Sequence, residues 1–70
     1  MDIELQIDEE ANTAYIHLGP PRPTHHDTVL GRMGVIFNWD INGGLVRIEL
    51  LDARSMLGSV WDRHLKRDCV

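Results

Sequence analysis

The sequence predicts an α+β protein that is mainly β: an antiparallel β-meander of four to five strands with a short C-terminal helix packed on one face. Two observations support this fold class. Residues 1–51 contain runs in which apolar and polar side chains alternate, which is the periodicity of a strand. Residues 52–70 repeat apolar side chains every three or four positions, as a helix does. We therefore expect a single domain, residues 1–70, with a β-meander at 1–51 and a helical tail at 52–70.

The first two expected strands form a hairpin. Residues 2–8 alternate, with Ile3, Leu5 and Ile7 on one side, and residues 13–18 read TAYIHL. The polar residues between these runs are too few for anything but a hairpin connection. Prolines in the segment 19–23 end the second strand, because proline cannot donate to a β-ladder. A third, shorter and more polar strand is expected at residues 24–30.

Asn42 and Gly43 are structural residues that mark the turn of a central hairpin within residues 34–53, because both tolerate a positive φ. Two registers are open. A three-residue turn with Asp40 facing Gly44 would place the apolar Phe37 opposite a charged side chain. A two-residue turn pairs apolar residues with each other and is therefore favoured. Its pairs are Trp39 with Val46, Phe37 with Ile48, and Val35 with Leu50.

The tail changes to helical spacing after Asp52, which is a plausible helix N-cap. Gly58 interrupts the helical pattern, and Ser59 with Asp62 resembles a new capping box, so two short helical pieces are expected. We expect Trp39 to pack in the core. The candidate oligomer interface is the apolar side of the tail: Met56, Leu57, Val60 and Trp61.

Composition excludes several classes of function. The chain has 70 residues and a net charge of -4, which disfavours nucleic-acid binding, although Arg54, Arg63, Lys66 and Arg67 form a small basic cluster. The single cysteine, Cys69, allows no intrachain disulfide and no cysteine-based zinc site. The N-terminus is acidic rather than signal-like, and no run is long enough to span a membrane. A cytoplasmic location is expected.

Two stretches carry a resemblance to a known family. Asp8 ends the first strand and is followed by Tyr15-Ile16 in the second; a later run reads Ile48-Glu49-Leu50-Leu51-Asp52-Ala53. These stretches resemble the small bacterial domain-of-unknown-function family 2283 (YuzE-like), over residues from about 3 to 55. Asn12 and Arg47 depart from the family pattern, which has Asp and Gly there. The resemblance implies a β-rich fold and no established activity, so it supplies no catalytic residues.

The only metal candidates are His17, His26 and Asp27, which come together only if the second and third strands pair. His25 cannot join His26 on one ion, because neighbouring strand residues point to opposite faces. The favoured interpretation is a polar edge strand that discourages edge pairing. A pH-dependent interface is a further alternative, because histidine titrates near neutrality.

No set of side chains suggests catalysis, and no cofactor is expected. Asp40 and Asp52 fall at opposite ends of the hairpin and cannot form an acid/base pair. The leading hypothesis is a non-enzymatic structural or interaction module that forms a homo-oligomer, because a chain this short has little core of its own. One alternative is an antitoxin-like or regulatory partner of another small protein. The other is a metal-dependent enzyme built on His17, His26, Asp27 and Glu49.

Overall fold

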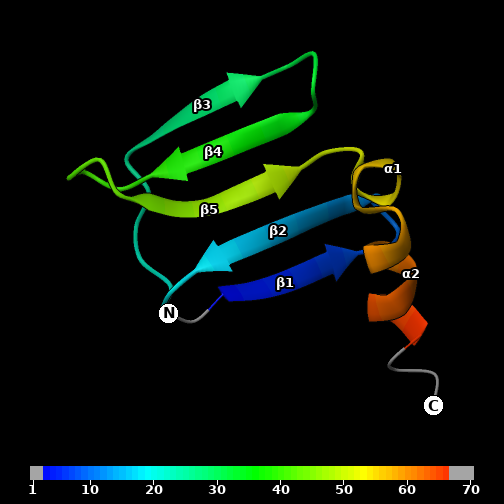
Figure 1. Ribbon diagram of the computed structural model, residues 1–70. Helices are drawn as coiled ribbons and strands as arrows, with labels where there is room; N and C mark the ends of the chain where they lie inside the picture. Colours follow the sequence, from blue (N-terminus) through cyan, green and yellow to red (C-terminus); the bar gives the residue numbers. More distant parts are fainter. Residues whose placement is uncertain (1–2, 67–70) are drawn as a thin grey trace.

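A computed structural model describes residues 3–66 as one five-stranded antiparallel sheet with two short helices at one end (Figure 1). This confirms the predicted fold class. The elements are β1 (Ile3–Asp8), β2 (Thr13–Leu18), β3 (His26–Leu30), β4 (Val35–Trp39), β5 (Leu45–Leu50), α1 (Ala53–Leu57) and α2 (Ser59–Lys66). Arg67 and Cys69, which the sequence singled out, lie outside the described residues.

The order of strands in the sheet is β1-β2-β5-β4-β3, which corrects the sequential meander expected from the sequence. The pairs β1–β2, β3–β4 and β4–β5 follow the chain, but β2 pairs with β5 rather than with β3. The proline-containing segment 19–25 carries the chain from β2 to the far edge. There every residue of β3 is exposed. The more apolar β5 takes the central position, where it pairs on both sides.

The central hairpin combines the two registers that the sequence left open. Two predicted pairs are confirmed by the register, Val35 with Leu50 and Phe37 with Ile48, and on the opposite face Asn38 pairs with Arg47. The register then shifts, so that Trp39 pairs with Leu45 instead of Val46. At the tip, the Gly43 N–H donates to the Asp40 carbonyl at 3.1 Å and the Asp40 N–H to the Gly44 carbonyl at 2.8 Å. This is the three-residue turn, and a β-bulge at Val46 restores the apolar pairing beyond it.

The turn falls at Asn42-Gly43 as predicted, but it also includes Ile41, and of the two predicted residues only Gly43 has a positive φ, of 83°. The tail also forms two helical pieces, separated at Gly58, whose φ is 54°. Asp52 occupies the N-cap position of α1 but makes no capping hydrogen bond with its side chain. Another residue, Asn12, performs that role.

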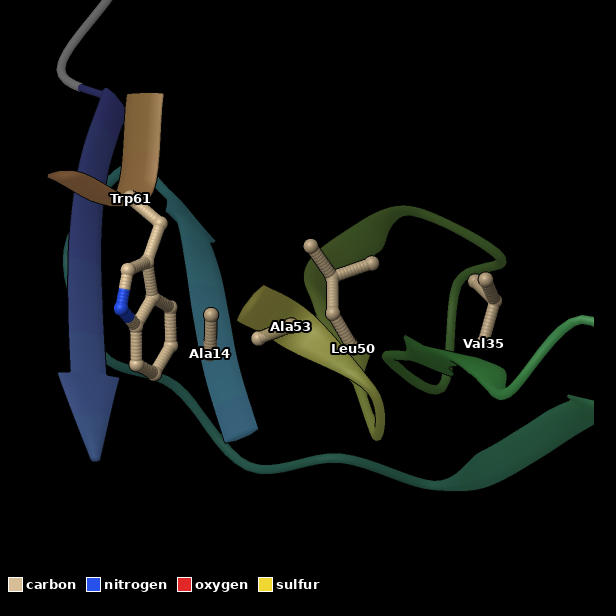
Figure 2. Packing of buried hydrophobic residues seen from close by; sticks show 5 residues of the cluster. All are labelled: Ala14, Val35, Leu50, Ala53 and Trp61. Atoms are coloured by element: carbon tan, nitrogen blue, oxygen red, sulfur yellow. The ribbon is translucent and has the colours of Figure 1, made fainter. Parts of the chain in front are cut away.

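The helices cover only one end of the sheet. The buried apolar cluster is a single line of side chains, running from Trp61 through Ala14, Ala53 and Leu50 to Val35 (Figure 2). Two of these five residues are alanines, and the molecule is flat, with a smallest dimension of 17 Å. Within residues 3–66, neither helix has the length and apolar character that crossing a membrane requires.

Candidate functional site

The sheet face that carries the helices consists of three rows of side chains running across the strands. The row nearest the helices is Ile7, Ala14, Leu50, Val35 and Leu30. The next row is Leu5, Ile16, Ile48, Phe37 and Thr28. The row farthest from the helices includes Ile3, Leu18, Trp39 and His26. We call the second and third rows the open apolar rows.

Burial falls along most of this face, away from the helices; the exception is Val46 at the hairpin bulge, which is 6% exposed. Three members of the first row, Ala14, Val35 and Leu50, are at most 7% exposed. In the open apolar rows Ile16, Phe37 and Ile48 are only half-buried. The outermost residue, Ile3, is 61% exposed. Among the described residues, the largest side chain that is less than 2% exposed is the polar Asn38. Within residues 3–66, α1 and α2 therefore do not cover the open apolar rows.

Aromatic rings gather in the part of the open apolar rows formed by β3 and β4. The ring of Trp39 stacks on His26 at a centroid distance of 6.2 Å and lies 6.2 Å from Phe37. The Trp39 indole N–H donates to the Thr28 hydroxyl at 3.0 Å. His25 meets the edge of His26 at 5.9 Å. This arrangement holds a flat, mostly apolar surface in place while leaving it accessible.

The opposite face carries the charges and is mainly polar, although Tyr15, Ile36 and Val29 also lie on it. One row crosses all five strands in the order Glu4, His17, Arg47, Asn38 and Asp27. The Asn38 amide donates to Asp27 at 2.7 Å and accepts the Arg47 Nε–H at 2.5 Å. Both ends of the Asn38 amide are therefore hydrogen-bonded. Because Asn38 is 1% exposed, loss of either partner would leave a buried polar group unsatisfied and would lower the stability of the fold.

The structure does not bring the proposed metal ligands together. His17 lies on β2 and Asp27 on β3, with β5 and β4 between them, roughly 14 Å at the usual strand spacing. His26 points to the face opposite both of them, and Glu49 pairs with Tyr15. Among residues 3–66, no group of three or more His, Cys, Asp or Glu side chains is close enough to hold a metal ion. The structure therefore gives the metal-dependent enzyme no assembled site.

The two tryptophans exchange the places expected from the sequence. Trp61 is 4% exposed and packs in the protomer's own core, so it is not available to a partner. Trp39, expected in the core, is half-buried in the open apolar rows. Leu57 packs partly against the core, whereas Met56 and Val60 remain exposed, at 42% and 45%. The reason is that α2 returns over β1 and β2, where Ala14 leaves room for the Trp61 ring (Figure 2).

Two polar contacts that the sequence did not predict hold the ends of the sheet. Arg22 donates to the Leu18 carbonyl at 3.0 Å, the Leu45 carbonyl at 2.7 Å and the Asp40 carboxylate at 3.1 Å. It thereby ties the proline-containing segment to β2, β5 and the hairpin loop. With Asp40, it also lines a pocket of about 370 Å³ beside His25. An arginine between prolines followed by an aspartate 18 residues later is too common a pattern to have indicated this.

The second contact joins the β1–β2 turn to α1. Asn12, with a φ of 55°, accepts the Arg54 N–H at 2.8 Å through its side chain and the Ala53 N–H at 3.1 Å through its carbonyl. Its amide also donates to the Asp52 carboxylate at 3.0 Å. Asn12 therefore caps a helix that begins about 40 residues later in the chain. An asparagine in a turn was the only sequence signal for this role.

Comparisons with known proteins give one match. The sequence profile of a family described as "Protein of unknown function (DUF2283)" matches residues 5–54, from β1 to the start of α1. Neither the curated proteins nor the solved structures include a significant match to this chain. The family match covers β1 from Leu5 onward, the other four strands and the Asn12–Asp52 contact. The chain therefore belongs to the DUF2283 family of proteins of unknown function.

Proposed function

We propose that this protein is an interaction module that works as a homo-oligomer, in which the open apolar rows of one copy are covered by the same rows of a second copy. The observation that carries the proposal is the half-covered apolar face. A sheet with one apolar face needs a second layer over that face, and here α1 and α2 supply it at one end only. Two sheets packed face to face, about 10 Å apart, would complete the layer.

Charge supports a second copy as the occupant. The chain has a net charge of -4, so two copies repel each other except where their contact surfaces carry no charge. Apart from the titratable His26, the open apolar rows contain only uncharged side chains, whereas Glu4, Arg47 and Asp27 lie on the opposite face. The face without charge is therefore the one on which self-association costs least.

The exposed area is also of the required size. The chain has an accessible surface of 5208 Å², against about 4,450 Å² for a folded monomer of its mass. The chain therefore exposes about 750 Å² more than a typical monomer of its mass, an excess of the same order as the roughly 800 Å² that each partner buries in a standard interface.

Two lysine substitutions on the same strand test the proposal. Thr28→Lys places a charge within the open apolar rows, whereas Val29→Lys places the same charge one residue later, on the opposite face. Both sites are exposed, so neither change disturbs a buried side chain. Size-exclusion chromatography with light scattering should give an oligomer for the wild type and for Val29→Lys, and a monomer for Thr28→Lys.

Further variants separate the possible causes. Thr28→Val removes the acceptor of the Trp39 indole N–H without adding charge and should still associate. Val60→Lys tests the tail interface expected from the sequence and should also associate. A monomeric wild type at high micromolar concentration would refute the proposal. Loss of association in Val60→Lys but not in Thr28→Lys would move the interface to the helices.

The polar face favours a second candidate function, a regulatory partner of another small protein. Glu4, Asp8, Glu49 and Asp27 give this face four carboxylates against one arginine, Arg47. Such a surface complements a basic partner, as an antitoxin-like protein would require. Co-purification from the native host tests this candidate. A captured basic protein that Val29→Lys weakens and Thr28→Lys does not would support it.

A further inference from the structure

We infer that His26 makes the self-association of this chain sensitive to pH, so that the oligomer forms at neutral pH and separates in mild acid. The inference rests on the proposed function, because it concerns the same open apolar rows. It assigns a regulatory role to a residue that the sequence had suggested as a metal ligand.

The geometry places His26 within the surface that a second copy would cover. His26 pairs with Trp39 across β3 and β4, and their rings are nearly parallel, with an interplanar angle of 16°. Its side chain is exposed in the single chain. A partner that packs on Trp39 and Phe37 must therefore also cover the imidazole stacked beside them.

Few charged groups face this imidazole. On its own strand, Asp27 lies on the opposite sheet face, and Thr28 is uncharged. On β4 the neighbour is the indole of Trp39. From the preceding segment, His25 meets the ring edge, and the Arg22–Asp40 ion pair lies beyond it in the pocket next to His25. Within the described residues, the ring contacts of His26 are thus the Trp39 indole and the His25 imidazole, with no carboxylate that would stabilise its charged form.

The direction of the effect follows from proton binding. An imidazolium loses hydration when it is buried, so the associated form takes up a proton on His26 less readily than the separate chains do. Acid favours the state that binds more protons, which here is the separate chains. In a symmetric pair the two copies would contribute equally. Overall acidification makes the chain less negative and would by itself promote association, so the two mechanisms predict opposite signs.

Sedimentation equilibrium at pH 7.5 and 5.5, at fixed ionic strength, measures the effect. The dissociation constant of the wild type should rise by roughly 10- to 100-fold at the lower pH, for one or two histidines that lose a proton on association. His26→Gln should associate with little dependence on pH. His17→Gln is the matched control, because His17 lies on the polar face, and it should retain the wild-type dependence.

Each outcome discriminates between the two proposals. A wild type that is monomeric at both pH values overturns the homo-oligomer and this inference together. A wild type that associates equally well at both values leaves the homo-oligomer standing and overturns only the role of His26. The same holds if His26→Gln keeps the full pH dependence. If His25→Gln, and not His26→Gln, abolishes the pH dependence, the pH-sensitive residue is His25, and the role proposed for His26 is overturned.

Discussion

At the scale of single residues, Asp40 has the most heavily bonded carboxylate in the described part of the chain. One oxygen accepts the N–H groups of Asn42 and Gly44, at 2.9 and 2.8 Å, and the other accepts the Arg22 Nε–H. The Gly44 N–H is the largest cause that lowers the pKa of Asp40 below 3.8, followed by Arg22. The carboxylate therefore stabilises the hairpin loop and the Arg22 segment together.

Asp40→Asn tests this role through pH. A lowered pKa means that the native chain holds its charge more firmly than the unfolded chain, so the stabilisation is present above pH 3.8 and is lost as the pH falls below it. Urea unfolding at fixed protein concentration should show the wild type more stable than Asp40→Asn at pH 5, with a gap that narrows towards pH 3. A gap that stays constant over this range would contradict the assignment.

At the scale of elements, α1 depends on a residue outside it. The helix has five residues and is too short to be stable alone. Its first N–H groups are satisfied by Asn12 in the β1–β2 turn, while Asp52 holds the Asn12 amide. The turn between the first two strands therefore fixes where the tail begins, and with it the place where Trp61 enters the core.

Replacing Asn12 should loosen this connection. Asn12→Ala removes the cap and places a Cβ-bearing residue with little αL tolerance at a φ of 55°, so it should lower the free energy of unfolding by roughly 1–3 kcal/mol. Asn12→Gly removes the same cap without the backbone strain and should cost less by about 1 kcal/mol. Denaturant unfolding measures both. Equal losses in the two variants would show that strain plays no part, and no loss in either would refute the capping role.

At the scale of the whole molecule, the proposed homo-oligomer would add burial to a flat protein that has only a short line of buried residues. The buried apolar side chains among the described residues include two alanines and no phenylalanine, and Trp61 is the only large ring among them. A core of this size supplies little net stability, as expected for small chains. The second copy would contribute much of the missing burial.

Melting temperature should therefore depend on protein concentration. For a dimer that dissociates as it unfolds, a tenfold increase in concentration should raise the Tm by roughly 5 °C, given the usual unfolding enthalpy of two chains of this length. Calorimetry or circular dichroism over a hundredfold range measures the slope. Thr28→Lys is the control and should melt at a lower temperature that is independent of concentration. A wild-type Tm without any slope would contradict the dimer.

The sequence by itself determined the local structure of this protein: five strands, an Asn-Gly hairpin, two helical pieces broken at Gly58, and the family to which the chain belongs. These features follow from alternation, helical spacing and turn residues, all of which are read from neighbours in the chain. The same signals separated an apolar sheet face from a polar one.

Only the tertiary structure decided which segments meet. It placed β5 beside β2, buried Trp61 instead of Trp39, and separated His17 from Asp27 by two strands. It also joined Asn12 to α1 and Arg22 to Asp40. Contacts between residues far apart in the chain produce no periodic pattern in the sequence, because they depend on how all the strands and helices pack together. Within residues 3–66, α1 and α2 cover this apolar face at one end only.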